Sequence, residues 1–149
     1  MEEHAAALAD AIEAALPGWV ERSVARVMTD WKGDVDDDVR RAAADAGRKA
    51  VADVGPRVRE LLATDIDEQR TTPLSLVRAA VRFPTAVLHA AGVPAVRRDE
   101  QQERLFPDDV YDLAPATFAD VDPALAEVGI AWGAAKAFEH LQRHKVGRS

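Results

Sequence analysis

LADAIEAALPGWVERSVARVMTDW, residues 8–31, carries the strongest helical signal in the chain. Large apolar residues recur in it every three or four positions, the spacing of one face of an α-helix. These positions are Leu8, Ile12, Leu16, Val20, Val24, Val27, Met28 and Trp31. Pro17-Gly18 interrupts the run, so the pattern predicts either two consecutive helices or one kinked helix.

The chain continues with further helical patterns whose breaks contain proline. An alanine-rich stripe from Val39 to Val54 predicts a helix in close contact with a neighbour. Gly55-Pro56 is expected to interrupt that helix before a shorter one. Thr72-Pro73 supplies a capping residue and a first-turn proline for the next helix, and a further break is expected at Phe83-Pro84.

The C-terminal part shows one helix stop and two helix starts. Residues 92–94, Gly-Val-Pro, have the pattern of a helix end with a left-handed glycine. A short helix is expected over residues 99–105, with Asp99 and Gln102 spaced for a capping box. Asp122-Pro123 starts the last helix, which is expected to reach His140 or beyond.

These patterns predict an all-α fold in a single domain over residues 1–149. We expect an irregular helical bundle of five to seven helices, several of them started or kinked by proline, because no run alternates as a strand would. Its parts are alanine-rich helices over residues 1–64, helices around an irregular segment 93–122 within residues 65–143, and a basic tail at 144–149.

Composition narrows the class of protein. With 48% apolar and 30% charged residues, the chain is typical of a folded globular protein. Its net charge of −7 argues against nucleic-acid binding, and the longest uncharged stretch, residues 83–96, is too short and too often broken to span a membrane. The absence of cysteine, and of a basic then apolar leader, predicts a cytoplasmic protein. Arginine far outnumbers lysine, which indicates a high-GC bacterial source.

Three aspartates in FPDDVYDL, residues 106–113, have the spacing Asp-Asp-x-x-Asp. The stretch resembles the aspartate-rich motif of isoprenoid diphosphate synthases and terpene synthases, which bind Mg²⁺ through carboxylates. Those enzymes also need a longer helical chain and a second acidic motif, which this sequence lacks. The favoured interpretation is a proline-started helical turn with its aspartates outward and with Phe106, Val110 and Leu113 inward.

Two other acidic groups match metal motifs only in part. Glu100 and Glu103 resemble half of the motif of all-α nucleotide pyrophosphohydrolases, but the second half is missing. Aspartates within residues 34–38 match the start of a calcium loop, which then lacks its glycine at Val39. A solvated helix face explains the first group, and an N-terminal helix cap explains the second.

Histidines and glycines on the last helix raise further alternatives. His140 and His144 are spaced i, i+4, which can chelate zinc when a third ligand approaches. They share a side with Lys136 and Arg143, whereas the apolar side carries Ile130, Ala134, Phe138 and Leu141, so we expect the pair to be solvated. His89 is expected to be a core histidine. Gly129 and Gly133 form a surface that should receive part of the 93–122 segment.

The C-terminal half resembles an uncharacterised helical family of high-GC Gram-positive bacteria over residues 65–143. The stretches that carry the resemblance are TTPLSLVRAAVRFPTAVLHAAGVP, RLFPDDVYDLAPATFADVDPAL and GIAWGAAKAFEHL. It implies a helical fold and a cytoplasmic location. No activity, cofactor or catalytic residue follows from it.

The leading functional hypothesis is a non-enzymatic interaction or regulatory protein whose partner surface lies on residues 97–122. Long connections are uncommon in compact domains unless they bind something or pack. A protein partner is expected and homo-oligomers are compatible with the sequence, whereas no catalytic, cofactor-binding or metal-binding residue is assigned. The candidate partner-binding residues are Arg97, Arg98, Arg104, Asp108, Asp109, Tyr111 and Asp112.

Two alternatives stay open at this stage, beside a third hypothesis, a nucleic-acid role that would rest on the basic tail at residues 143–149. The aromatic and apolar side chains of that segment, among them Tyr111 and Phe118, could simply be satellite core. The other alternative is a metal-dependent enzyme or small-ligand binder that acts on phosphorylated substrates through the acidic clusters. Such a protein would be stabilised by Mg²⁺ or Mn²⁺.

Overall fold

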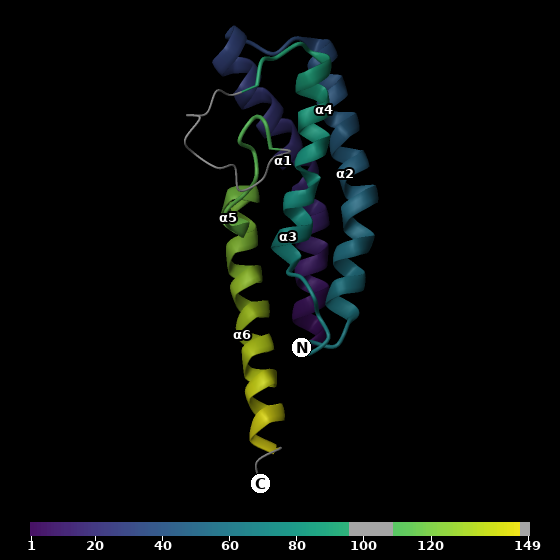
Figure 1. The fold of residues 1–149 in the computed structure, drawn as a ribbon, viewed down its shortest axis with the longest axis vertical. Helices are drawn as coiled ribbons and strands as arrows, with labels where there is room; N and C mark the ends of the chain where they lie inside the picture. The colour runs from purple at the N-terminus through teal and green to yellow at the C-terminus, as the bar shows by residue number, and fades with distance from the viewer. Residues whose placement is uncertain (96–108, 147–149) are drawn as a thin grey trace.

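The computed structural model describes residues 1–95 and 109–146, and in these residues the chain is all-α, without strands (Figure 1). This confirms the predicted helical bundle. A short 3₁₀ helix links two of the α-helices. The elements are α1 (Glu2–Lys32), α2 (Asp37–Ala63), α3 (Pro73–Arg78), η1 (Ala79–Val81), α4 (Arg82–Ala90), α5 (Phe118–Val121) and α6 (Pro123–Val146).

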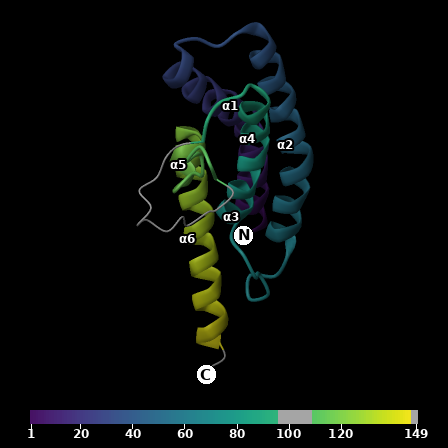
Figure 2. The same ribbon diagram turned by 45° about the horizontal axis from the view of Figure 1, so that its top comes forward.

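α1 is the central helix of the bundle. It contacts α2, α4, α5 and α6, and its buried face runs from Leu8 to Met28. α2 returns alongside α1, α3 and α4 lie along the pair, and α6 covers α1 on the side away from α2 (Figures 1 and 2). The C-terminal part of α6 extends beyond the end of the bundle where the N-terminus lies. None of the described helices combines the length and apolarity that crossing a bilayer requires.

Two prolines stand inside continuous helices. α1 passes through Pro17 as one helix, which agrees with one of the two predicted alternatives. α2 passes through Pro56, so the predicted interruption at Gly55-Pro56 is wrong. A proline in a helix removes one backbone hydrogen bond. In α2 the buried Val54 and Val58 lie on the same face on either side of the proline, and their packing against the bundle offsets that loss.

The alanine-rich face of α2 approaches α1 closely, as predicted. A Cβ atom added to Gly47 would lie 2.9 Å from the Cα atom of Pro17 and 3.2 Å from its carbonyl oxygen. Ala43, Ala46 and Ala50 are buried beside Gly47. Small side chains at this crossing let two backbones meet, so the α1–α2 contact depends on them.

Capping residues set the predicted helix ends. Asp36 accepts a hydrogen bond from the Val39 amide at 2.9 Å at the start of α2, which confirms the helix-cap interpretation of residues 34–38. Thr72 accepts from the Ser75 amide at 3.2 Å at the start of α3. Gly92 has φ +79°, and the Val93 amide donates to the Leu88 carbonyl at 3.0 Å, which is the predicted helix stop after α4.

The break predicted at Phe83-Pro84 lies a few residues earlier. The chain tightens into the 3₁₀ helix over Ala79–Val81, and α4 begins at Arg82. Pro84 therefore stands in the first turn of α4, where a missing N–H leaves no helical hydrogen bond unmade. The predicted start of the last helix at Asp122-Pro123 is confirmed, with the Ala124 amide bonded to the Asp122 carboxylate at 2.9 Å.

Candidate functional site

The segment that begins at Asp109 forms a tight turn held by its own carboxylate. Asp109 is only 4% exposed, and its two oxygens accept from the amides of Leu113 at 2.6 Å and Ala114 at 2.8 Å. Asp112 has φ +57°, which is not helical. The predicted helical turn with outward aspartates is therefore wrong at Asp109, because local side-chain to backbone bonds compete with the helix. The helix predicted over residues 99–105 lies outside the described residues.

Tyr111 is part of the core. Its side chain is 2% exposed, its hydroxyl donates to the Val93 carbonyl at 2.7 Å, and burial raises the pKa of the phenol above its ordinary value of 10. The ring lies edge-on to His89, with 5.5 Å between ring centroids. His89 itself is exposed, so its prediction as a core histidine is wrong.

Tyr111→Phe is expected to destabilise the protein by about 1 kcal/mol at neutral pH, the usual net value of one hydrogen bond. Because the folded-state pKa is raised, the contribution of Tyr111 to stability is present below about pH 10 and is lost as pH rises through the folded-state pKa. Tyr111 is the only tyrosine, so phenolate absorbance during an alkaline titration reports this group alone. A midpoint at or below that of free tyrosine would contradict the burial.

Four of the predicted partner-binding residues, Arg97, Arg98, Arg104 and Asp108, lie outside the described residues. The other three do not form one surface: Asp109 and Tyr111 are buried, and only Asp112 is exposed. Partner binding by this set stays a prediction. What the described part of the segment does is pack against the bundle.

Several contacts fix the rest of this segment to the helices. Arg78 donates to the carbonyls of Pro115 at 2.8 Å and Ala116 at 3.0 Å, and Arg22 donates to the Val121 carbonyl at 2.8 Å. Phe118 packs on Gly129, where an added Cβ atom would lie 2.5 Å from the ring. The predicted contact between the glycine surface of α6 and the 93–122 segment is therefore confirmed at Gly129, whereas at Gly133 an added Cβ atom would meet nothing within 4 Å among the described residues.

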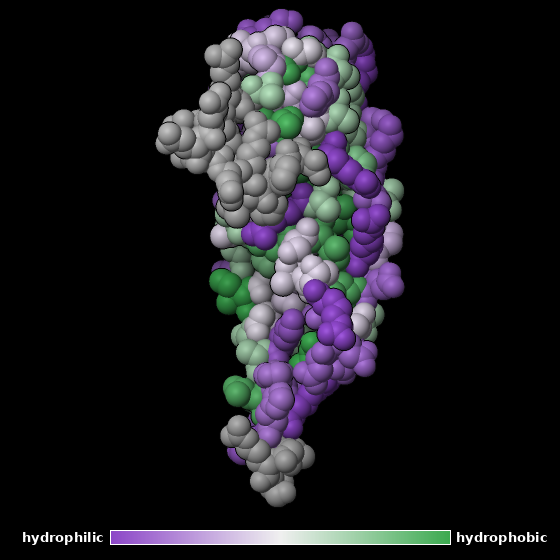
Figure 3. All heavy atoms as spheres, viewed as in Figure 1, coloured by the Kyte–Doolittle hydropathy of each residue, from purple (hydrophilic) through white to green (hydrophobic). Residues whose placement is uncertain are grey.

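The orientation of α6 about its own axis is the reverse of the predicted one. Its apolar side faces solvent: Ile130 is 72% exposed, Phe138 64% and Leu141 67%. We name the residues on this side the outer stripe, and they are Ile130, Ala134, Ala137, Phe138 and Leu141. In the space-filling view, hydrophobic residues stand out as separate groups along the outer edge of α6 (Figure 3). Among the α6 side chains whose burial the structure describes, the buried apolar ones, Leu125 and Trp132, lie in the first half of the helix.

The polar side of α6 faces the connector between α2 and α3, residues 64–72. Lys136 Nζ donates to Gln69 Oε1 at 3.1 Å, and Arg143 Nη1 donates to Asp65 Oδ1 at 2.7 Å and Asp67 Oδ2 at 3.0 Å. This is the reason for the reversed orientation: the connector offers carboxylate and amide oxygens, which cationic side chains match and apolar ones do not.

Arg143 dominates the electrostatics of this contact. Its hydrogen bond holds the pKa of the Asp65 carboxyl below its ordinary value, with the Asp67 amide as the next cause. The pKa of Arg143 is raised in turn by Asp65 and Asp67. All three side chains are more than a third exposed, so each pair alone contributes little to stability and their effect comes from the network.

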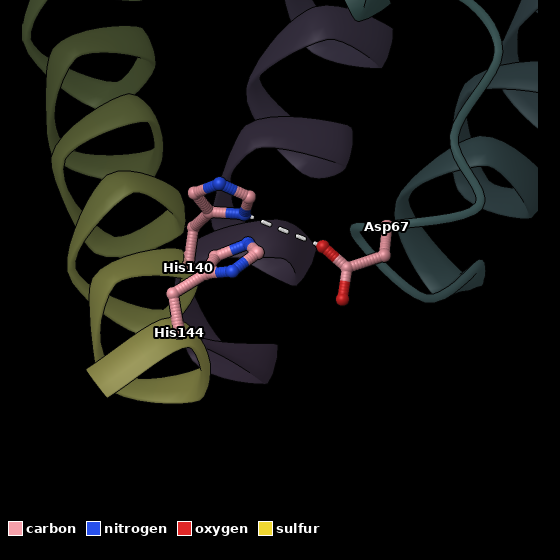
Figure 4. A group of neighbouring side chains, drawn as sticks. All are labelled: Asp67, His140 and His144. Carbon is pink, nitrogen blue, oxygen red and sulfur yellow. Dashed lines mark hydrogen bonds and ion pairs between the residues drawn. The ribbon is translucent and has the colours of Figure 1, made fainter. Parts of the chain in front are cut away.

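His140 and His144 meet Asp67 at the end of this contact (Figure 4). The two rings lie with centroids 4.2 Å apart, and His140 Nδ1 is 3.3 Å from Asp67 Oδ1. One ligand atom from each of the three residues lies within 4.8 Å of the others. All three are exposed, as predicted for the histidine pair. The i, i+4 spacing revealed the pair in the sequence, but no local signal marked Asp67, which is 73 residues away from His140.

Comparisons with known proteins supply no relative: no protein-family model, no curated protein and no solved structure matches the chain. The resemblance of residues 65–143 to a helical family therefore stays a prediction. Function has to be inferred from the arrangement of the described residues.

Proposed function

We propose that the chain is a non-enzymatic interaction protein that self-associates through the outer stripe of α6. One observation supports this most directly: three large apolar side chains, Ile130, Phe138 and Leu141, are 64–72% exposed on one side of one helix. Single exposed apolar residues are normal on monomers, whereas contiguous apolar patches mark interaction sites.

The spacing of the outer stripe suits another helix. Ile130, Ala134, Ala137 and Leu141 follow one another at intervals of four, three and four residues, the pattern of a helix–helix seam. The two alanines lie at the centre and the larger residues at the ends. A second helix can therefore approach α6 closely at the middle of the stripe, as small residues allow at helix crossings.

A second copy of the chain is the occupant that fits best, with the two α6 helices antiparallel. About a two-fold axis between Ala134 and Ala137, Ile130 of one copy meets Leu141 of the other, and Ala134 meets Ala137. The same operation places Glu127 opposite His144 and next to Lys145, and all three residues are exposed. The stripe is thus flanked by opposite charges that match in the antiparallel orientation only.

The pairing is expected to be reversible and modest in affinity. α6 is about 36 Å long at 1.5 Å per residue, and one side of it offers fewer residues than the 20–30 a side of a standard interface. Self-association should therefore depend on protein concentration in the micromolar range, on the order of −8 kcal/mol.

Replacing both Phe138 and Leu141 by glutamate should make the protein monomeric, because four carboxylates would enter an apolar seam. Sedimentation velocity over a range of concentrations measures this, with an expected loss of affinity of at least about tenfold. The matched control is Ala52→Glu with Ala86→Glu, which adds the same charge at exposed positions of α2 and α4, outside the stripe, and should keep the wild-type dimer. A wild type that stays monomeric, or a stripe variant that dimerises equally well, would refute the proposal.

Charge reversal tests the orientation of the helices. Glu127→Lys and Lys145→Glu should each weaken the dimer, and the double variant should recover it, because each pair is restored with reversed sign. A parallel pair would place Glu127 beside its own copy, and the double variant would then bring no recovery. The stripe variant tests whether the chain self-associates through α6, and the charge variants test whether the two helices are antiparallel.

The acidic clusters give no comparable support to an enzyme that acts on phosphorylated substrates. Asp109 is occupied by two backbone amides and Asp36 by a helix cap. Asp108 lies outside the described residues. The outer stripe is therefore the feature on which the proposal rests.

A further inference from the structure

We infer that Asp67, His140 and His144 form a binding site for one divalent transition-metal ion, with Zn²⁺ as the representative of the class. The fold brings these residues together from two places: the histidines lie one turn apart on α6, and Asp67 lies in the connector that α6 covers (Figure 4). None of its ligands belongs to the outer stripe, although Ala137 of the stripe also lines the groove beside them.

The donor set fixes the class of ion. Two imidazole nitrogens and one carboxylate oxygen suit Zn²⁺ and its neighbours in the first transition row, which bind such sets with further positions open to water. Mg²⁺ and Ca²⁺ prefer sites made of oxygen atoms alone. These residues are therefore expected to bind a transition-metal ion, whereas the acidic stretch at residues 106–113 was considered as a site for Mg²⁺.

The distances require only a small closure. Ligands of a tetrahedral zinc ion lie roughly 3.3 Å apart, given bonds of about 2.0–2.1 Å. Here the three ligand atoms lie within 4.8 Å of one another, and His140 Nδ1 is already 3.3 Å from Asp67 Oδ1. The side chains of His140 and Asp67 are 54% and 48% exposed, so they can rotate by this amount without disturbing the core.

Neighbouring groups orient the carboxylate. Arg143 donates to Asp67 Oδ2 at 3.0 Å, which leaves Oδ1 directed at His140. The Asp67 amide donates to Asp65 Oδ1 at 3.0 Å and so fixes the turn. Such outer partners hold metal ligands in place. Arg143 also repels a cation, but Asp65, which accepts from the same guanidinium, reduces that effect.

Solvent has room beside the ligands. An open groove of about 500 Å³ is lined by Ile66, Asp67, Gly133, Lys136, Ala137 and His140. A Cβ atom added to Gly133 would meet nothing within 4 Å among the described residues, so this side of α6 is unobstructed. Water molecules can therefore complete the coordination of a bound ion and exchange from this side.

Calorimetric titration with Zn²⁺, on a chain without a histidine tag, tests the site. The expected result is one ion bound per chain, at all protein concentrations. His140→Ala and His144→Ala should each weaken binding by more than about tenfold, since even the loss of an outer partner commonly costs 10–100-fold in affinity. Co²⁺ gives a second readout, because its visible spectrum reports nitrogen ligation and should change in both variants.

Two control variants distinguish Zn²⁺ binding at this site from binding at another histidine and from an effect of self-association. His4→Ala removes an exposed histidine on α1 and should leave binding unchanged. The Phe138→Glu, Leu141→Glu variant keeps all three ligands and should bind Zn²⁺ as the wild type does, whether or not the chain self-associates. Helix content measured by circular dichroism confirms that each variant is folded. The inference is overturned if the wild type binds no Zn²⁺, if half an ion binds per chain, or if the histidine variants bind as tightly as the wild type.

Discussion

Gly47→Ala is expected to lower the free energy of unfolding by about 1–2 kcal/mol. In an ordinary helix this change would stabilise by about 1 kcal/mol, because alanine is the better helix former. Here the new methyl group would lie 2.9 Å from the Cα atom of Pro17. That atom belongs to the backbone of α1, so the clash is relieved only if the two helices separate, and overpacking of this kind costs about 1–3 kcal/mol.

Gly133→Ala is the matched control for that change. It is also a helical glycine, but an added Cβ atom there meets nothing within 4 Å among the described residues. It should therefore stabilise the protein by about 0.5–1 kcal/mol through helix propensity alone. Urea unfolding followed by circular dichroism measures both variants, and the two changes should have opposite signs. Equal stabilisation would show that α1 and α2 are not in close contact at Gly47.

Asp109→Ala is expected to cost about 2–4 kcal/mol, because it removes the acceptor of two amides in a buried turn, each worth about 1–3 kcal/mol when left unpaired. The amides of Leu113 and Ala114 have no other acceptor among the hydrogen bonds of the described residues. Asp109→Asn should cost less, since its amide oxygen can still accept one of the two bonds.

Thermal and urea unfolding distinguish these outcomes, with an unchanged m-value as the sign that the unfolded state is the same. Asp112→Ala is not a suitable control, because Asp112 has positive φ. Asp37→Ala is better: it removes an exposed carboxylate elsewhere in the chain and should change stability by less than about 1 kcal/mol. If Asp109→Ala were as mild, the turn would be held by Tyr111 and the two arginine contacts rather than by the carboxylate.

Local rules predicted the helices and most of their ends. The caps at Asp36, Thr72 and Asp122 and the stop at Gly92 depend on residues within a few positions of each other, so the sequence contains the whole cause. The continuity of α2 through Pro56 does not follow from local rules, because the compensating contacts come from helices distant in the sequence.

The candidate sites depend even more on contacts between residues that are distant in the sequence. Helical spacing predicted which residues form the apolar side of α6 and which form its polar side. It did not predict which of the two sides packs against the bundle. That choice is made by the charged connector at residues 65–69, which precedes α6 by more than 50 residues. The same long-range contact supplies Asp67 to the histidine pair. The prediction for Asp109 was wrong for a different reason: an aspartate two residues after a proline suits both a first helical turn and a capped loop.

The reversed orientation of α6 also divides this helix into two regions of unequal local stability. Up to Trp132 it is held by buried apolar side chains, whereas from Lys136 onward it is held by partly exposed polar contacts. Such contacts contribute less and are weakened by salt. The opening free energy of the last turns is therefore well below that of the core. We therefore expect the amide hydrogens of these turns to exchange with solvent through local fraying, and those in the buried part of α1, from Leu8 to Met28, to exchange only when the whole bundle opens.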